Sequence, residues 1–146
     1  MKESCNTMKR STKISTIMCT TPVTCHSRQK LSDVRRAFET NKIHHMPVVS
    51  GTRFIGLISA SDLLRVSFGD TYTQDTRAID SLLDTMSITE VMIEDVYTIE
   101  PSATVREAAE RLATGSFHGL PVVDVEGNLQ GMLTSTDLIK FLLDQF

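Results

Sequence analysis

Apolar residues recur at helical spacing in several stretches of the chain, most clearly between Val105 and Ala113. Spacings of three and four residues place them on one face of an α-helix. Thr104 and Glu107 have the spacing of a capping box, in which each side chain bonds to the backbone of the other residue. The pattern therefore predicts a helix that starts after Thr104 and stops at Gly115, because glycine readily adopts the left-handed conformation that ends many helices.

The chain contains an internal repeat, which appears when the sequence is shifted against itself by 74 positions and, after one insertion, by 75. The matched positions are Ile14 with Ile88, Met18 with Met92, Thr24 with Thr98, Thr40 with Thr114, His44 with His118, Pro47-Val48-Val49 with Pro121-Val122-Val123, Gly56 with Gly131, and Asp62-Leu63 with Asp137-Leu138. The sequence predicts two copies of one unit, at residues 14–66 and 88–146. Residues 1–13 are expected to be a flexible segment, and residues 67–87 to be a linker.

Each copy shows the same order of patterns. The first helix of the first copy has a weaker apolar stripe, with Asn41 predicted to adopt the left-handed conformation of Gly115. Two apolar strands around a glycine-containing turn follow each first helix, and a closing helix follows them. The expected elements are short strands near Val23-Thr24 and Tyr97-Thr98, strands at Met46–Val49 and Leu120–Val123, and closing helices at Leu63–Val66 and Leu138–Leu143.

This order predicts an α+β fold of two β-α-β-β-α repeats. A unit of about sixty residues buries only roughly 60% of its unfolded surface, so each copy is marginal alone. We expect the two copies to pack around a pseudo-twofold axis, with ligand-sized clefts between them. The linker is expected to hold a connecting helix, because five apolar residues recur there at helical spacing: Ala78, Ile79, Leu82, Leu83 and Met86.

Composition and charge exclude several classes of protein. The chain has 146 residues, 40% of them hydrophobic and 23% charged, which is typical of a globular protein. A net charge of -3 without a long basic cluster argues against a nucleic-acid partner. No apolar run approaches the roughly 20 residues of a membrane span, and MKESCNTMKR is no signal peptide, so we expect a cytoplasmic protein without membrane contact. Met8 is an alternative start to Met1.

The cysteines favour a reducing compartment. Cys5, Cys19 and Cys25 are odd in number and lack the spacing of a metal or redox motif. Cys25 and His26 are neighbours on an expected strand, so their side chains point to opposite faces and cannot act together as nucleophile and base.

The ordered motifs resemble those of paired cystathionine beta-synthase (CBS) domains, also called Bateman modules. They are Ile17-Met18, HHMPVV at 44–49, GLISASDL at 56–63, Val91-Met92, HGLPVVD at 118–124 and GMLTSTDL at 131–138. The resemblance covers nearly the whole chain and implies the same fold. It also implies an adenosine-containing ligand, either AMP, ADP, ATP or S-adenosylmethionine, and a sensing role without catalysis or a catalytic cofactor. Such proteins commonly form homodimers through closing helices like the apolar one that contains Phe141, Leu142, Leu143 and Phe146.

The helix starts carry the candidate ligand groups. Asp62 and Asp137 can each accept hydrogen bonds from both vicinal hydroxyls of a ribose, since a carboxylate accepts on two oxygens. Hydroxyls and free backbone amides at the same helix starts suit a phosphate. These hydroxyls belong to Ser59, Ser61, Thr134 and Thr136. The alternative interpretation is that both carboxylates and hydroxyls are ordinary helix caps.

Further candidates come from the turn before each apolar strand. His44, His45 and His118 would face anions, as basic residues of this turn do in nucleotide-sensing members of the family. Their charge depends on pH, and polar turn residues that face water are the alternative. A metal site at His44 and His45 is not expected, because no further ligand completes it. Thr24, Thr98, Met46 and Leu120 are candidates for the adenine pocket, with a core position favoured for Met46 and Leu120.

Two functions from different classes follow. The first is a regulatory module that binds an adenosine-containing ligand and signals to a separate effector protein, since we expect no output domain within these residues. The second is a ligand-free dimerisation or docking scaffold with the same fold. An enzyme is the weakest alternative, because the motifs provide no nucleophile, base and oxyanion-stabilising set.

Overall fold

The computed structural model describes residues 11–67 and 75–146, so residues 1–10, with Cys5 and Met8, lie outside the described part. The chain forms two compact units: residues 23–96, and residues 97–146 together with the N-terminal segment that ends at Pro22. Both combine helices and strands, which confirms the predicted α+β class. The packing of the two copies around a pseudo-twofold axis stays a prediction. No helix in the described part is long and apolar enough to cross a membrane.

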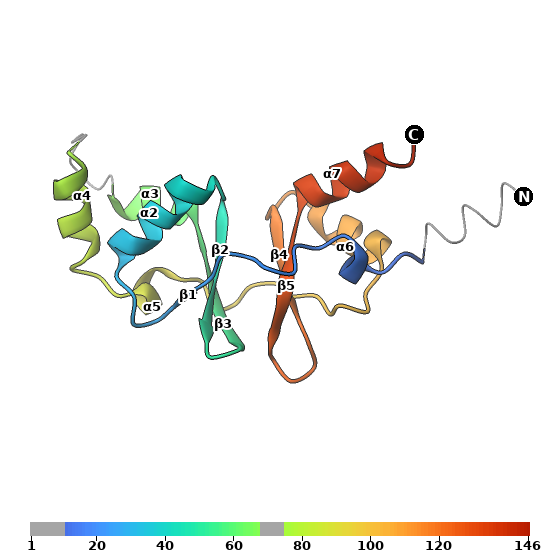
Figure 1. Ribbon diagram of the computed structural model, residues 1–146, viewed down its shortest axis with the longest axis horizontal. Helices are drawn as coiled ribbons and strands as arrows, with labels where there is room; N and C mark the ends of the chain where they lie inside the picture. Colours follow the sequence, from blue (N-terminus) through green and yellow to red (C-terminus); the bar gives the residue numbers. More distant parts are fainter. Residues whose placement is uncertain (1–10, 68–74) are drawn as a thin grey trace, which may run out of the picture. The chain divides into compact units, whose positions relative to one another are not determined.

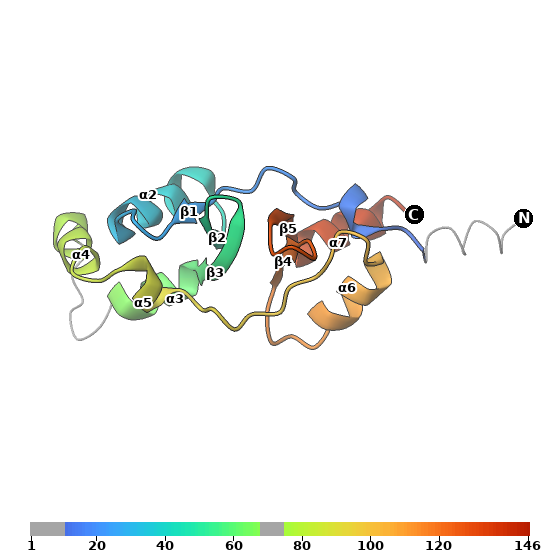
Figure 2. The ribbon, with the colours of Figure 1, turned by 90° about the horizontal axis from the view of Figure 1, so that it is seen from below.

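The unit of residues 23–96 contains a three-stranded sheet in the order β1-β2-β3 (Figure 1). Strand β1 pairs parallel to β2, and β2 pairs antiparallel to β3. Helix α2 contacts α3 and α4, and α3 contacts α5 (Figure 2). The elements are β1 (Cys25–His26), α2 (Leu31–Asn41), β2 (His45–Ser50), β3 (Arg53–Ser59), α3 (Ala60–Ser67), α4 (Thr76–Leu83) and α5 (Ile88–Val91).

The other unit repeats this plan with a smaller sheet. Strands β4 and β5 form an antiparallel hairpin, and Ile99 makes a parallel bridge to Val122 where the first unit has β1 beside β2. Helix α6 contacts both β4 and α7. The elements are the 3-10 helix η1 (Ile14–Thr16), α6 (Val105–Leu112), β4 (Gly119–Val123), β5 (Leu129–Thr134) and α7 (Ser135–Leu143).

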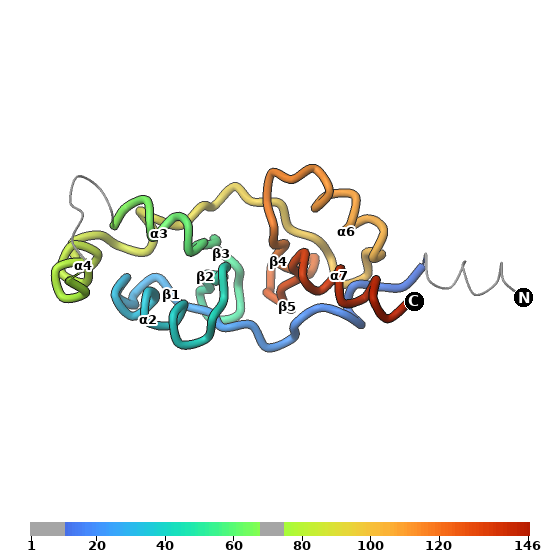
Figure 3. The backbone as a smooth tube through the Cα atoms, turned by 90° about the horizontal axis from the view of Figure 1, so that it is seen from above, coloured from blue at the N-terminus to red at the C-terminus, as the bar shows by residue number. Residues whose placement is uncertain are grey.

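The segment that begins each sequence repeat packs against the core of the other repeat. Ile14 is fully buried in the cluster that contains Ile99, Val105 and Leu120. Ile88 is fully buried in the cluster that contains residues of α2 and β2. Figure 3 shows the blue N-terminal segment beside the C-terminal elements of its unit. The compact units therefore exchange these segments relative to the repeats at 14–66 and 88–146.

Backbone pairing holds each exchanged segment to a strand edge. Cys19 and Met132 exchange two hydrogen bonds of 2.9 Å, so residue 19 extends the β5 edge. Leu57 and Ile93 make the same pair, also at 2.9 Å, on the edge of β3. Both pairs satisfy backbone groups that a sheet edge would otherwise leave unpaired.

The capping predictions are confirmed for α6. Thr104 accepts a hydrogen bond from the Glu107 amide, and Glu107 accepts one from the Thr104 amide. Gly115 has a φ of 76°, in the left-handed region. The prediction for Asn41 is wrong: Asn41 is the last residue of α2, its side chain donates to the Ala37 carbonyl at 2.8 Å, and Lys42 has the left-handed φ of 52°. Helix α2 runs further than α6, so the left-handed residue comes one position later.

The predicted first strands are displaced. Strand β1 starts at Cys25 instead of Val23, and in the other unit Ile99 makes the bridge in place of Tyr97-Thr98. Burial explains the shift, because Cys25 and Ile99 are only 3% and 6% exposed whereas Thr24 is exposed. Helix α4 lies within the segment expected to be the linker, and it buries Leu83. The short helix α5 was not predicted.

The described cysteines are free thiols. Cys25 is buried and His26 is exposed, which confirms that their side chains lie on opposite faces of β1. Burial raises the pKa of the Cys25 thiol to about 11, so it is protonated at neutral pH. Cys19 is exposed.

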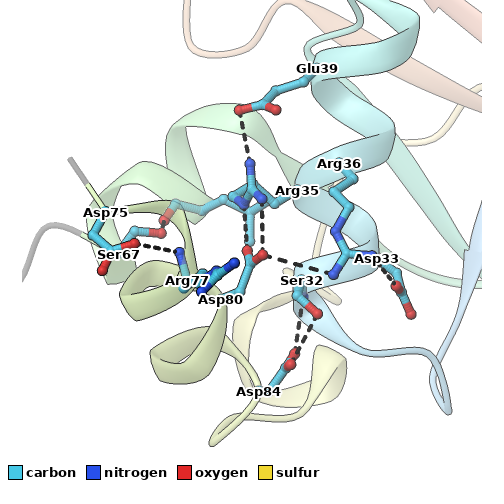
Figure 4. Close-up of polar contacts among 11 residues, drawn as sticks. Ser32, Asp33, Arg35, Arg36, Glu39, Ser67, Asp75, Arg77, Asp80 and Asp84 are labelled. Carbon is cyan, nitrogen blue, oxygen red and sulfur yellow. Dashed lines mark hydrogen bonds and ion pairs between the residues drawn. The ribbon is translucent and has the colours of Figure 1, made fainter. Parts of the chain in front are cut away.

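Ion pairs attach the connecting helix α4 to α2 (Figure 4). Arg35 donates to both carboxylate oxygens of Asp80, with Nε at 2.6 Å and Nη2 at 3.1 Å. Ser32, which is buried, donates to Asp84 from its amide and its hydroxyl at 3.2 and 3.0 Å. The hydrogen bond from Arg35 lowers the pKa of Asp80 below its ordinary value of 3.8. The ionised form of Asp80 therefore stabilises this contact.

An Asp80→Asn substitution is expected to reduce stability in a pH-dependent way. A carboxyl with a lowered folded pKa contributes stability above its ordinary pKa, and this contribution disappears as the pH falls through the folded value. We expect a loss of about 1 kcal/mol near neutral pH, since both side chains are partly exposed. Urea unfolding should show the difference from the parent shrinking below about pH 4.

Asp33→Asn is the matched control, because Asp33 is 47% exposed and its pair with Arg36 is long, at 3.4 Å. It should change stability by less than about 0.5 kcal/mol. An effect of Asp80→Asn that stays constant down to the lowest pH would contradict the assigned role of its charge.

Candidate functional site

The start of α3 brings together three of the expected site residues of the first repeat. Oδ2 of Asp62 accepts hydrogen bonds from the amide and the hydroxyl of Ser59, at 3.1 and 2.7 Å. Oδ1 accepts from Nη2 of Arg65 at 2.9 Å. Asp62 is 6% exposed, whereas Ser61 is exposed. The Asp62 carboxylate therefore caps the helix and holds an arginine.

The start of α7 has the matching arrangement. Oδ2 of Asp137 accepts from the amide and the hydroxyl of Thr134, at 2.9 and 3.2 Å, in a complete capping box. Within the described residues no donor reaches Oδ1 of Asp137. Asp137 is half-buried and Thr136 is exposed. One carboxylate oxygen is therefore used by the cap, and the other is available.

The turn histidines lie next to these helix starts through their backbones. The Ala60 amide donates to the His44 carbonyl at 2.9 Å, and the Ser135 amide donates to the His118 carbonyl at 3.0 Å. Both imidazoles are exposed, and His45 is half-buried in β2. Ala60 and Ser135 occupy matching positions of the repeat, but their backbone bonds to the histidine turns were not predicted from the sequence. Each unit thus places a carboxylate, its neighbouring hydroxyls and a histidine turn at one helix start.

The four residues expected at the adenine pocket lie in different environments. Met46 and Leu120 are 1% and 0% exposed in the two hydrophobic cores, which is the position favoured for them from the sequence. Thr24 is exposed, immediately before β1. Thr98 is half-buried, accepts a 3.5 Å hydrogen bond on its carbonyl from Arg111 and lines an open groove of about 790 Å³ beside α6.

No metal centre is formed by the described part of the chain. Within residues 11–67 and 75–146, histidine, cysteine, aspartate and glutamate side chains nowhere form a group of three suited to a metal ion. The groups at the start of α7 suit an uncharged diol on the available carboxylate oxygen and an anion on the helix amides, and the start of α3 has the same residue types with both carboxylate oxygens engaged.

The chain belongs to the CBS domain family, whose sequence model matches residues 14–69 and 88–144. It is 30% identical over 147 residues to protein MJ1426 of Methanocaldococcus jannaschii, covering 84% of this chain and 86% of that protein. These matches confirm the two repeats predicted from the sequence.

Solved structures of CBS-domain pairs share the fold. CBSX2 in complex with AMP superposes with a TM-score of 0.77 and 20% identity, covering 92% of this chain and 98% of that chain; CBSX2 comes from Arabidopsis thaliana. The CBS domain pair of MJ0100, in complex with 5'-methylthioadenosine and S-adenosyl-L-methionine, superposes with a TM-score of 0.75 and 22% identity, covering 92% and 98%.

Several relatives are longer than this chain. It spans 41% of protein MJ1225 of Methanocaldococcus jannaschii. It spans between 21% and 26% of related homoserine O-acetyltransferases and inosine-5'-monophosphate dehydrogenases. In these enzymes the matching region is thus a minor part of the chain.

Proposed function

We propose that this chain is a regulatory module that binds an adenosine-containing small molecule and signals its presence to a partner protein. The observation that supports this most is that both repeats keep the same carboxylate, hydroxyls and histidine turn at the start of their closing helix. A helix cap alone needs no histidine turn. The AMP of CBSX2 and the two adenosine compounds of MJ0100 support a ligand of this class.

The ribose is the part of the ligand that a carboxylate recognises best. Each hydrogen bond from a hydroxyl to a charged acceptor contributes about 1.5–3 kcal/mol, so two contribute roughly 3–6 kcal/mol. In AMP, ADP or ATP, phosphate oxygens would accept hydrogen bonds from the helix amides, with Ser61, Thr136, His44, His45 and His118 nearby in the sequence repeat. Thr24 and Thr98 are the remaining candidates for the adenine.

Signalling requires the ligand to bind two states of the module with different affinities. An effector protein would read the difference, and a homodimer would present the closing helices. Exposed apolar side chains on and after α7 support a protein contact there: Ile139, Leu142 and Leu143 are 55–65% exposed, and Phe146 is 98% exposed. We further propose a cytoplasmic location and no catalytic activity of the chain itself.

Calorimetry on ligand-stripped protein tests this function directly. The chain is titrated separately with AMP, ADP, ATP and S-adenosylmethionine, with guanosine monophosphate as the control for the base. We expect saturable heat with at least one adenosine compound and none with the control. Absence of binding by all four compounds would contradict the proposal.

A ligand-free docking scaffold is the second candidate, because both carboxylates take part in helix caps. The two functions differ in the effect of Asp137→Ala. In a scaffold, this variant loses about 1 kcal/mol of stability as a lost cap, and nucleotide changes the melting temperature of neither protein. In a sensor, a ligand at a hundred times its dissociation constant stabilises the parent by about 2.7 kcal/mol, and the variant far less.

A further inference from the structure

The two repeats differ at the third residue after the carboxylate proposed to bind ribose. Arg65 lies three residues after Asp62 and donates to its Oδ1 at 2.9 Å. The matching residue after Asp137 is Lys140. Within the described part of the chain Lys140 makes no ion pair with Asp137. The planar guanidinium of Arg65 thus corresponds to the compact ammonium group of Lys140 in the second repeat.

The difference decides how many acceptors remain for a ligand. Asp62 accepts three hydrogen bonds, from the amide and hydroxyl of Ser59 and from Arg65, and both of its oxygens are engaged. Asp137 accepts two, both on Oδ2. Oδ1 of Asp137 retains its two lone pairs, one for each ribose hydroxyl.

Asp62 is also less exposed to solvent than Asp137. The side chain of Asp62 is 8% exposed under the guanidinium of Arg65, which is itself 72% exposed. Asp137 is half-buried. The capping bonds are also tighter in the first repeat, since the serine hydroxyl lies 2.7 Å from its carboxylate and the threonine hydroxyl 3.2 Å.

We propose that Arg65 suppresses ligand binding at Asp62, so that the site at Asp137 fills first and each chain binds one ligand in its main binding event. This inference rests on the proposed function and specifies its stoichiometry. A ligand that binds at Asp62 must displace Arg65 from its ion pair with that carboxylate. Breaking this exposed ion pair should weaken ligand binding by about fivefold. Exposing the buried carboxylate adds to this difference.

Calorimetry tests this inference by measuring how many molecules of an adenosine compound bind to each chain. The compound used is the one that binds the parent most tightly. The parent should bind one ligand per chain in its main event, with any second event at least about fivefold weaker. Asp137→Asn should weaken the main event by about a hundredfold or more, whereas Asp62→Asn should change it less than about threefold. Circular dichroism checks that each variant is folded.

Arg65→Gln is the gain-of-binding variant, and it changes only an exposed side chain. It should strengthen the second event by about fivefold, while Lys140→Gln leaves the stoichiometry unchanged. Two equal events in the parent, an equal loss from Asp62→Asn and Asp137→Asn, or no effect of Arg65→Gln would overturn the inference and leave the adenosine-binding function standing. Failure of every adenosine compound to bind the parent would overturn both.

Discussion

An Ile14→Ala chain is expected to lose about 3–4 kcal/mol of unfolding free energy, as is typical of an isoleucine truncated in a packed core. Ile14 is 0% exposed and lies among Ile99, Val105 and Leu120. The lost methylene contacts and the cavity left behind both contribute to the destabilisation. The loss should fall on the second repeat, although Ile14 belongs to the first repeat in sequence.

Native-state hydrogen exchange measures where the stability is lost. Ile14→Ala should lower protection in α6, β4, β5 and α7 more than in α2 and β2. Ile88→Ala is the reciprocal variant, since Ile88 is 0% exposed in the core that contains Leu31 and Ile58. Ser15→Ala is the control, because Ser15 is exposed beside Ile14. Protection lost mainly in α2 and β2 on Ile14→Ala would contradict the exchange of segments.

Gly131→Ala is expected to have the second large effect, with a loss of about 2–4 kcal/mol. A Cβ atom at residue 131 would lie 2.5 Å from the Cys19 carbonyl oxygen and 3.0 Å from the Met18 sulfur. A backbone oxygen cannot move aside like the end of a side chain, so the added methyl must separate the segment from β5. The two hydrogen bonds between Cys19 and Met132 would then be lost.

Alanine substitutions at two other glycines are the controls for Gly131→Ala, and urea unfolding measures the stability of all three variants. At Gly56 the nearest atom to an added Cβ is the flexible Met92 sulfur, at 2.7 Å, so Gly56→Ala should cost about 1–2 kcal/mol. At Gly51 nothing lies within 4 Å, and only the φ of 62° opposes alanine, at a cost of about 1 kcal/mol. If Gly131→Ala destabilised the protein no more than Gly51→Ala, the segment that contains Cys19 would not approach β5 closely.

Local patterns in the sequence predicted the elements well. The helix from Val105 to Leu112, its capping box and the left-handed Gly115 depend on residues within one or two turns of each other. The same reasoning failed for Asn41, because the left-handed residue after α2 is Lys42, one position later than the residue aligned with Gly115. That difference of one residue depends on how the helix packs and is absent from the local pattern.

The exchange of segments could not be predicted from the sequence, and the reason is physical. Ile14 and Ile88 are the same residue type at matching positions of the repeat, so either one fits either core by size and polarity. Gly56 and Gly131 lie within strands, where glycine often marks a close backbone neighbour, but a glycine does not identify which segment approaches it.

The sequence also identified the helix starts of the candidate site, and it offered both the ligand and the cap interpretations of their carboxylates. The structure shows the capping bonds of Asp62 and Asp137, which the spacing alone left open. It adds the engagement of Asp62 by Arg65. An arginine three residues along a helix has many rotamers, so its partner cannot be read from sequence.

Native mass spectrometry of the gently purified chain tests the adenosine-sensing account most directly, because a retained ligand reports its own mass. We expect one adenosine-containing molecule per chain, either carried through purification or taken up when AMP, ADP, ATP or S-adenosylmethionine is added, and its loss from the Asp137→Asn variant. A chain that stays unliganded with all four compounds present would contradict the account.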